Sequence, residues 1–399
     1  MSKLHRVLII GLQQALYQAF FEEKYADKVL EKLLKQNKKW GSKDRSFVAE
    51  SFYDIIRWKR RLAFYMDEEI KSSNLYKLIA TYLLYQGYEL APFEEFKGIN
   101  FKKLQSGFSK KIENPAIEHS VPDWLYNKLK SSYGKETDAI FDALNQPAEV
   151  YLRVNTLKTT KEKLVKSLAL ENVEALEVEN WPNALVLKDR KNLFRTQAFQ
   201  EGWFEVQDLS SQLVAESLAP NPGSRVLDVC AGAGGKTLHL ASLMENKGQI
   251  IALDLYEWKL AELKRRARRA GAHNIETRPI VAKTIKRLKD SADFLLMDAP
   301  CTGIGVLKRN PDAKWKLDEN FIDRIEVEQA EILQNYSKIL RSGGKMVYAT
   351  CSILPEENEK QIEKFLLNNP NFKLLKQRLL LPNQTGNDGF YIAELERLS

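Results

Sequence analysis

Cysteine and histidine are scarce in this chain: its 399 residues include 3 Cys and 4 His. Three cysteines cannot build a disulfide framework, and the scattered histidines do not combine with them into a zinc-ligand spacing. We therefore expect no bound metal and a reducing compartment, the cytoplasm.

Long apolar runs are missing as well. No stretch approaches the roughly 18 apolar residues of a membrane span. The run Val7–Ile10 is interrupted at Gly11 before it reaches the length of a signal peptide. The sequence predicts no membrane partner, and it leaves the oligomeric state open.

What is present indicates a multidomain protein with cores of ordinary size. Hydrophobic residues make up 44% of the chain and charged residues 29%, and the length suggests two or three domains. Lys and Arg (61) exceed Asp and Glu (53), which gives a formal net charge of +8 and a pI near 9.0. This balance favours a polyanionic partner such as nucleic acid, although many ordinary enzymes carry a similar charge.

Changes in pattern divide the chain into three predicted domains: a helical domain over residues 1–118, a small α+β module over 119–206, and an α/β domain over 207–399. In the first domain, apolar residues at helical spacing run from Leu12 to Leu34 and from Phe47 to Ile56, and a further helix is predicted over Leu75–Tyr85, before Gly87.

Two basic stretches of the first domain have simple interpretations. Arg57, Lys59, Arg60 and Arg61 follow an apolar pattern, and we favour a solvated helix end over an RNA contact. The Lys-rich segment from Lys102 to Ser120 is predicted to be a linker.

The second domain shows short strands and a helix. Leu152, Val154 and Thr156 alternate with polar residues, residues 161–168 suit a helix, and residues 184–187 suit a strand. A module of this size is compatible with a ferredoxin-like sheet and could bind RNA.

In the third domain, apolar strands alternate with helical patterns, which predicts a parallel, doubly wound, Rossmann-like sheet. The predicted strands are 225–229, 249–253, 277–280, 294–297 and 345–349, and the predicted helices are 237–243, 258–270 and 322–340. Ligands in this architecture bind beyond the carboxyl ends of the strands.

A glycine-rich turn, residues 230–237, follows the first of these strands. A phosphate-binding P-loop needs glycine where Cys230 stands, and a dinucleotide fingerprint needs glycine where Thr237 stands. Both interpretations are weakened, and S-adenosylmethionine is the remaining cofactor class. Asp254, after the second strand, is placed to accept the hydroxyls of a ribose, which does not separate S-adenosylmethionine from NAD. A tight turn without ligand, and a helix N-cap role for Asp254, stay open as simpler interpretations. Cys230 itself is expected to be a packing residue.

Two cysteines follow the fourth and fifth predicted strands, and if these strands are neighbours, both thiols emerge over the same crevice as the glycine turn. Cys301 comes after Asp298-Ala299-Pro300, and Cys351 comes after Thr350. A thiolate that adds to carbon 6 of a pyrimidine makes carbon 5 nucleophilic enough to attack a methyl donor, and a second group must then assist release. Asp298 could hydrogen-bond the base and stabilise the charge that develops on addition.

A series of motifs runs along the chain in a fixed order: Leu152–Thr156, Phe204–Asp208 with Ser210–Gln212, Gly234–Thr237, Asp298–Cys301, Asn310–Asp312 with Lys314–Trp315, Tyr348–Ser352, and Pro355–Asn358. Together they resemble the Sun/Nop family of RNA cytosine carbon-5 methyltransferases, in particular the bacterial type that acts on ribosomal RNA. The resemblance covers about residues 120–399. The preceding helices resemble, more weakly, a NusB-type RNA-binding domain.

The resemblance implies roles for individual residues. Cys351 would be the nucleophile, Cys301 would assist product release, Lys236 would contact the target base, and Asp298 would contact the cytosine or the edge of the cofactor. The implied S-adenosylmethionine site comprises Cys230, Ala231, Gly232, Ala233, Gly234, Gly235, Lys236, Asp254 and Asp298. The implied partner is RNA, ribosomal first and transfer RNA as an alternative.

The sequence departs from the family pattern at two places. Gly232-Ala233 stands where the family has Ala-Pro, and Ala282 stands where an acidic residue would receive the adenine amino group. Two surface features are ambiguous: the basic residues of 257–270 suit a solvated face or a phosphate track, and Trp315 is slightly better explained as a loop anchor than as a base-stacking residue.

Two other functions compete with a methyltransferase. In a P-loop nucleotide hydrolase, Asp298 would be a metal ligand. A non-catalytic ribosome-assembly factor would keep the fold and bind RNA without transferring methyl groups.

Overall fold

The computed structural model describes residues 4–398, so the first and last residues of the predicted outer domains lie outside it. The chain divides into two compact units. One runs to Gln146 and takes up Leu307–Asp318, and the other consists of Pro147–Val306 and the residues from Glu319 onward. The predicted boundaries after residues 118 and 206 divide the chain differently and stay a prediction.

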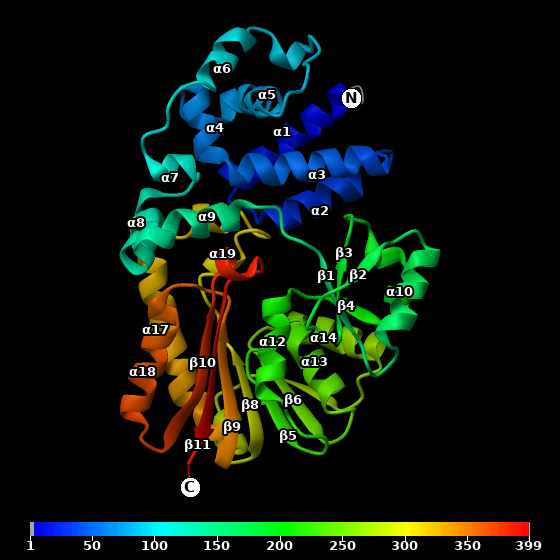
Figure 1. Cartoon of the computed structure of the whole chain (residues 1–399), viewed down its shortest axis with the longest axis vertical. Coiled ribbons are helices and arrows are strands. Elements are labelled where there is room, and N and C mark those ends of the chain that lie inside the picture. The colour runs from blue at the N-terminus through cyan, green and yellow to red at the C-terminus, as the bar shows by residue number, and fades with distance from the viewer. Residues whose placement is uncertain (1–3, 399) are drawn as a thin grey trace. The chain divides into compact units, whose positions relative to one another are not determined.

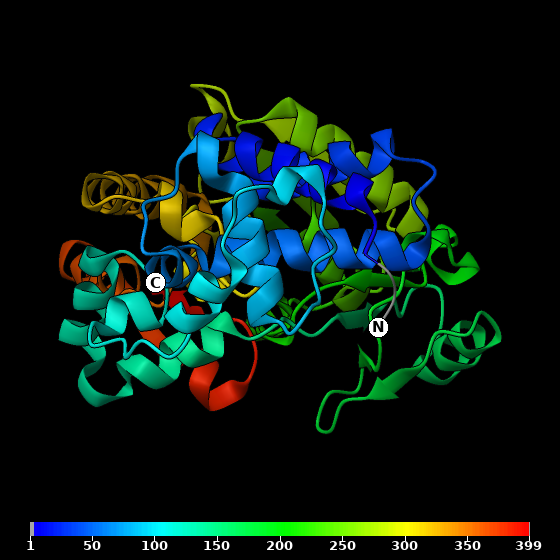
Figure 2. The ribbon, with the colours of Figure 1, turned by 90° about the horizontal axis from the view of Figure 1, so that it is seen from above.

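The first unit is helical, as its apolar spacing predicts (Figure 1; Figure 2 gives the view from above). Its helices are α1 Arg6–Phe21, α2 Ala26–Gln36, α3 Ser42–Arg57, α4 Lys59–Met66, α5 Leu75–Tyr85, α6 Phe101–Gly107, α7 Pro115–Glu118, α8 Asp123–Tyr133, α9 Thr137–Asn145 and α16 Ala313–Lys316. Leu12, Phe52 and Ile79 are fully buried in one core that α1, α3 and α5 share. The helix predicted over Leu75–Tyr85 is confirmed.

The predicted linker over 102–120 is wrong, because this segment contains α6 and α7. Both short helices begin at a capping asparagine: Asn100 accepts a hydrogen bond from Lys103 N, and Asn114 accepts one from Ala116 N. Such caps satisfy backbone donors that a short helix otherwise leaves unpaired, and they offset the low helix propensity of a polar, Lys-rich sequence.

The basic residues at the end of α3 do not form the expected solvated face. Arg57 is buried, and Lys59 begins a new helix, with its ammonium 5.3 Å from the centre of the Trp315 ring. Arg60 forms an ion pair with Asp123 at 2.7 Å. The sequence pattern did not reveal these partners because most of them are distant along the chain.

The segment Leu307–Asp318 belongs to the helical unit although it lies between strands of the other unit in the sequence. Lys314 is 1% exposed, and its ammonium donates to Arg57 O at 2.9 Å and to Asn145 Oδ1 at 3.3 Å. The indole of Trp315 donates to Ile56 O at 2.8 Å and packs against the helical core. Trp315 is therefore an anchor, which confirms the preferred interpretation.

The second unit begins with a small antiparallel sheet of strand order β2-β3-β1-β4. Its elements are β1 Tyr151–Val154, α10 Lys161–Leu170, β2 Ala175–Glu177, β3 Ala184–Leu187, α11 Gln197–Gln200 and β4 Phe204–Val206. Leu152, Leu164 and Leu185 meet in its core. The predicted α+β module is confirmed.

A seven-stranded sheet of order β10-β11-β9-β8-β5-β6-β7 forms the rest of the unit. Its elements are α12 Leu209–Leu218, β5 Arg225–Asp228, α13 Gly235–Leu243, β6 Gln249–Asp254, α14 Glu257–Ala270, β7 Ile275–Pro279, α15 Thr284–Leu288, β8 Ala292–Asp298, α17 Glu319–Tyr336, β9 Leu340–Thr350, α18 Glu359–Asn368, β10 Phe372–Leu380, α19 Pro382–Thr385 and β11 Phe390–Arg397. The five predicted strands are parallel, whereas β10 and β11 add an antiparallel edge that was not predicted.

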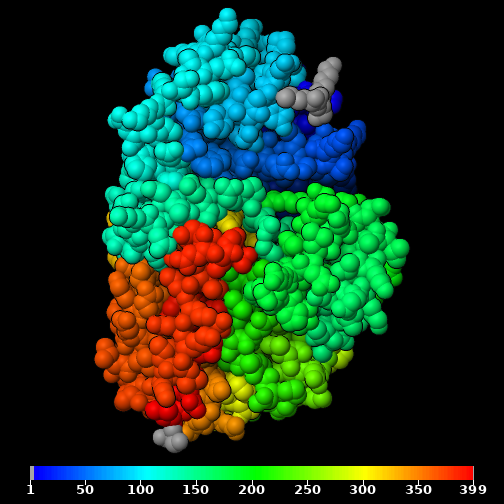
Figure 3. All heavy atoms as spheres, viewed as in Figure 1, coloured from blue at the N-terminus to red at the C-terminus, as the bar shows by residue number. Residues whose placement is uncertain are grey.

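Helices cover both faces of this sheet (Figure 1). Neighbouring residues of one strand pack on opposite faces: Leu296 lies in the cluster that includes α12, α13 and α14, and Leu295 lies in the cluster that includes α17 and α18. This burial on both faces explains why the central strands are continuous apolar runs. The last segment of the chain, which includes α19, reaches the surface in Figure 3.

Buried polar residues join the small module to the large sheet. Asn155 donates from Nδ2 to Gly202 O and to Ala270 O, both at 2.7 Å. Glu205 pairs with Arg266 at 2.8 Å and with Arg269. These two arginines of α14 are therefore engaged within the protein, which corrects both interpretations of the basic helix at these positions.

No helix within residues 4–398 combines the length and the apolar character needed to cross a bilayer.

Candidate active site

The two thiols predicted to share a crevice lie in contact. Strands β8 and β9 are parallel neighbours in which Asp298 pairs with Ala349. Cys301 follows the end of β8, Cys351 directly follows β9, and their sulfur atoms are 3.2 Å apart. The contact raises the pKa of the Cys301 thiol well above its usual value, through its hydrogen bond with Cys351 and then through burial.

Lys236 and Asp298 form an ion pair at the carboxyl ends of β5 and β8. Lys236 lies in the first turn of α13, and its Nζ is 2.7 Å from Asp298 Oδ2. Burial opposes the charge of the lysine, but the interactions with Asp298 and with Cys351 outweigh burial and raise its pKa. The ammonium therefore keeps a positive charge close to both the carboxylate and the Cys351 thiol.

The glycine turn between β5 and α13 uses backbone conformations that favour glycine. Gly232 and Gly234 have positive φ angles of 55° and 89°. A Cβ at Gly234 would lie 2.5 Å from Leu263 Cγ, so this position requires glycine, whereas a Cβ at Gly232 or Gly235 would meet no atom within 4 Å. The turn therefore packs closely against Leu263 at Gly234, and it borders open space at Gly232 and Gly235.

Asp254 connects that turn to the residues that precede α14. Its Oδ2 accepts a hydrogen bond from Gly232 N at 2.9 Å, and its Oδ1 accepts one from Tyr256 N at 2.8 Å. The N-cap of α14 is Tyr256, so the alternative role of Asp254 as the cap is wrong. Each carboxylate oxygen retains a lone pair for another donor, such as a ribose hydroxyl.

Asp228, the last residue of β5, lies beside the glycine turn and was not among the predicted site residues. It is 1% exposed, its Oδ2 accepts the Thr237 hydroxyl at 2.7 Å, and its Oδ1 has no hydrogen-bond partner among the described residues. Burial raises its pKa to about 7. Its place at a strand end beside the glycine turn was the available signal.

The remaining predicted positions lie in or near the glycine turn, except Ala282, which follows β7. Cys230 packs against the core on the α17 face, and burial raises the pKa of its thiol, as expected of a packing residue. Ala231 is buried and Ala233 is partly exposed within the turn, and the Ala233 carbonyl accepts a hydrogen bond from Arg266. Ala282 is exposed beyond β7.

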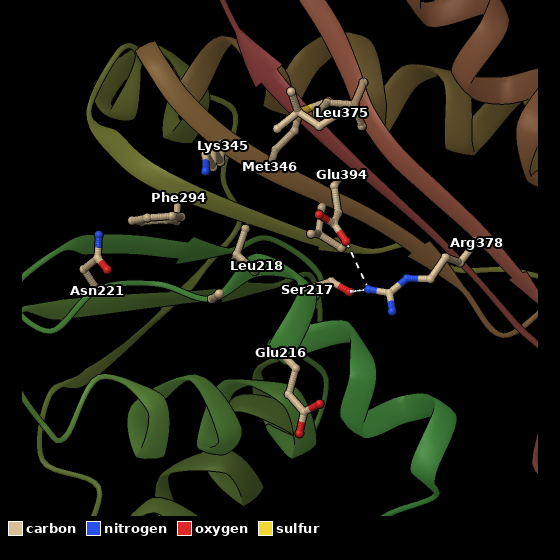
Figure 4. Close-up of a pocket in the computed structure, with 13 residues that line it drawn as sticks. Glu216, Ser217, Leu218, Asn221, Phe294, Lys345, Met346, Leu375, Arg378 and Glu394 are labelled. Carbon is tan, nitrogen blue, oxygen red and sulfur yellow. Dashed lines mark hydrogen bonds and ion pairs between the residues drawn. The ribbon is translucent and has the colours of Figure 1, made fainter. Parts of the chain in front are cut away.

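A pocket of about 400 Å³ lies elsewhere, between the end of α12 and strands β8 to β11 (Figure 4). Arg378 reaches across it to Ser217 Oγ at 2.5 Å and to Glu394 at 3.1 Å. The pocket borders Phe294, near the start of β8, whereas the thiols follow the other end of that strand. It therefore belongs to a different region from the thiols.

Comparisons with known proteins match this architecture. Residues 215–396 match the family model "16S rRNA methyltransferase RsmB/F", and residues 121–193 match the ferredoxin-like domain of RsmF/B-like methyltransferases. Ribosomal RNA small subunit methyltransferase B of Proteus mirabilis is 34% identical, over 74% of this chain and 70% of that protein. A probable enzyme of the same name from Synechocystis is 30% identical, over 89% and 91%.

Solved structures agree with these matches. The crystal structure of PH0851 covers 99% of this chain and 100% of its own, with a TM-score of 0.81 and 26% identity. NSun6 from Pyrococcus horikoshii with SFG covers 70% of this chain and 98% of its own, with a TM-score of 0.65 and 25% identity. The predicted family, fold class and S-adenosylmethionine cofactor are confirmed.

Proposed function

Because this chain belongs to the 16S rRNA methyltransferase RsmB/F family, we propose that it methylates carbon 5 of a cytosine in small-subunit ribosomal RNA through a covalent adduct. The contact between the two thiols, 3.2 Å apart beside a charged lysine, is the observation that carries the proposal. A P-loop hydrolase would not need a thiol pair, and this family is not one of nucleotide hydrolases.

Cys351 is the proposed nucleophile. Cys351 lies close enough to the Lys236 ammonium to interact with its charge, which would stabilise a thiolate formed at Cys351, whereas the hydrogen bond with Cys351 and burial raise the pKa of Cys301. Addition of this thiolate to carbon 6 of cytosine pushes electron density onto carbon 5, which then accepts the methyl group. The target base must be unpaired or flipped out of its helix to present carbon 6 to the sulfur.

Asp298 and Lys236 are proposed to hold the base. Hydrogen bonds to the ring nitrogen and the amino group of cytosine fix its orientation and stabilise the charge that develops on addition. The 2.7 Å ion pair orients both side chains before the base arrives.

Cys301 is proposed to assist release. After methyl transfer, a base such as water takes the carbon-5 proton, and the electrons of that C–H bond form the ring double bond as the Cys351 thiolate leaves carbon 6, which restores the aromatic ring. The Cys301 sulfur already touches the Cys351 sulfur, so it is placed at the bond that breaks.

The glycine turn from Cys230 to Lys236 and Asp254 would hold S-adenosylmethionine, the turn beside its amino-acid end and Asp254 at its ribose. When bound, S-adenosylmethionine supplies an electrophilic methyl group on its sulfonium sulfur. The open space at Gly232 and Gly235 and the spare lone pairs of Asp254 fit these roles.

The proposal is tested by product identity. Unmodified small-subunit ribosomal RNA and, in a parallel reaction, unmodified transfer RNA are incubated with the protein and methyl-labelled S-adenosylmethionine, and the products are mapped by bisulfite sequencing. We expect label in 5-methylcytosine at one or a few positions. Label in another nucleoside would overturn the carbon-5 assignment, no label in RNA would favour an assembly factor, and label only in transfer RNA would move the substrate.

A further inference from the structure

A buried carboxyl group bonds to the residues that follow both thiols, and it has no role in the mechanism proposed for the reaction. Glu357 ends the short 3₁₀ turn Pro355–Glu357 and has no exposed surface. Its two carboxyl oxygens accept hydrogen bonds from three neighbouring residues, Thr302, Gln329 and Ser352.

These donors come from both loops that carry the thiols. Thr302, next to Cys301, donates from its backbone N at 2.9 Å and from its hydroxyl at 2.5 Å. Ser352, next to Cys351, donates from its hydroxyl to the same oxygen that the Thr302 hydroxyl contacts. One carboxylate therefore joins the two chain segments at the residues that follow the sulfurs.

A third donor extends the connection to the other side of Cys301. Gln329 of α17 donates from Nε2 to Glu357 Oε2 and to the carbonyl of Pro300, both at 2.9 Å. Gln329, Thr302 and Ser352 are all buried, so water does not compete for these bonds, and an unpaired group would pay its full desolvation cost.

We propose that Glu357 is the positioning residue of the reaction, since its carboxylate sets the spacing of the Cys301 and Cys351 sulfurs by bonding to both of their loops. This inference rests on the proposed function for its catalytic consequence, although the spacing itself is measurable without turnover. Glu357 touches neither sulfur in the described structure, and it acts through Thr302 and Ser352.

The carboxylate has a second effect, on charge. Its negative charge contributes to raising the pKa of Cys301. Length and charge of the side chain therefore have separable consequences: the length holds the two loops at one distance, and the charge helps to keep Cys301 protonated.

The loops have further connections that do not involve Glu357, among them a contact of 3.1 Å between the Thr302 and Ser352 hydroxyls. Gly305 N donates to Cys351 O at 3.0 Å, and Gly389 N donates to Gly305 O at 2.8 Å. We expect the loops to shift relative to each other in Glu357 variants, because the carboxylate no longer bonds to both of them. The domain should stay folded, because these backbone bonds remain.

The experiment compares two variants that separate length from charge. Glu357→Asp keeps the charge but is too short to reach both loops, and Glu357→Gln keeps the length but replaces one acceptor oxygen with a donor. Gln361→Ala is the matched control, because Gln361 is also buried and bonds from α18 to Glu326 O at 2.9 Å without contacting either loop.

Thiol spacing is read with phenylarsine oxide, which condenses with two adjacent thiols, forming two As–S bonds and releasing one water. Bridging is followed by the mass of the intact folded protein. We expect wild type and Gln361→Ala to be bridged at the same rate and Glu357→Asp at least about fivefold more slowly. Equal bridging in wild type and Glu357→Asp would overturn the proposal, whatever the activity.

Turnover gives the second readout, with small-subunit ribosomal RNA and S-adenosylmethionine. Since a misplacement of about 1 Å can cost ~10²-fold in rate, we expect kcat to fall about 10–100-fold in both variants while KM for S-adenosylmethionine changes less than about threefold. Glu357→Gln removes the negative charge that helps to raise the pKa of Cys301, so the pH profile of kcat should move to lower pH in this variant. Glu357→Asp keeps the charge, so its pH profile should not move.

Retention of wild-type kcat in both variants would also overturn the inference. If wild type itself forms no 5-methylcytosine but Glu357→Asp still loses bridging, the proposed function fails and the positioning role stands. The two failures are thus distinguishable.

Discussion

The helical unit and the α/β unit both bury charged side chains, but they use them differently. In the helical unit, Lys314 donates to two oxygen acceptors, and burial, followed by the nearby charge of Arg57, lowers its pKa well below the usual value. In the α/β unit, Asp228 keeps an oxygen without a partner among the described residues, and Lys236, Asp298 and the thiols form interacting titratable pairs.

This difference shows that burial of charge alone does not identify an active site. A buried cation that donates to a backbone carbonyl and an amide oxygen fixes a segment in place. In the α/β unit, titratable groups interact with one another at the carboxyl ends of parallel strands. Such groups can still bind a substrate or exchange protons with it. The predictions below test whether the two regions separate in this way, from the largest expected effect to the smallest.

Removal of the nucleophile should have the largest effect. Cys351→Ala is expected to lower the rate of methyl transfer about 10³-fold or more, because the carbon-6 adduct cannot form. Melting temperature should change by only a few degrees, since the thiol makes few contacts that alanine cannot replace. A variant that retains turnover, measured by transfer of labelled methyl groups, would show that Cys351 is not the nucleophile.

Neutralisation of Asp228 should change how stability depends on pH. Burial raises its pKa to about 7 from an ordinary value of about 3.9, so between these values the folded chain holds a proton that the unfolded chain has released. Its contribution to the free energy of unfolding therefore falls as pH rises through this window.

In Asp228→Asn this decline is absent. The free energy of unfolding of the variant minus that of wild type should therefore increase from pH 5 to pH 8, by on the order of 2 kcal/mol. Urea unfolding at the two pH values measures the difference. An identical pH dependence in both proteins would contradict the raised pKa.

The anchor in the helical unit should give the smallest effect. Trp315→Phe keeps an aromatic ring in the core but removes the hydrogen bond to Ile56 O, which should cost about 0.5–1.5 kcal/mol in the free energy of unfolding. Methyl transfer should remain within about twofold of wild type. A loss of activity without loss of stability would indicate an RNA-stacking role in place of the anchor.

Much of the α/β unit was predictable because its signals are local. Short apolar strands, a glycine turn and residues that directly follow strands mark the crevice in the sequence, and the pairing of β8 with β9 brings Cys301 and Cys351 together as expected. The doubly wound order also follows from alternation of strand and helix.

What could not be predicted depends on contacts between distant residues. The edge strand β10 carries Lys373, Lys376 and Arg378, which interrupt its apolar pattern. Arg266 and Arg269 looked like a surface track because their partner, Glu205, lies about sixty residues earlier. Leu307–Asp318 joins the helical unit through similarly distant contacts, which no local pattern encodes.

The central claim, a covalent bond between Cys351 and the base that Cys301 helps to break, is tested most directly by trapping. Cys301→Ala is mixed with small-subunit ribosomal RNA and S-adenosylmethionine, denatured, and examined by gel electrophoresis for protein that remains attached to methylated RNA. We predict a denaturation-resistant complex for Cys301→Ala and none for the double variant Cys301→Ala/Cys351→Ala. A complex that persists in the double variant, or Cys301→Ala turning over at the wild-type rate without one, would contradict the account.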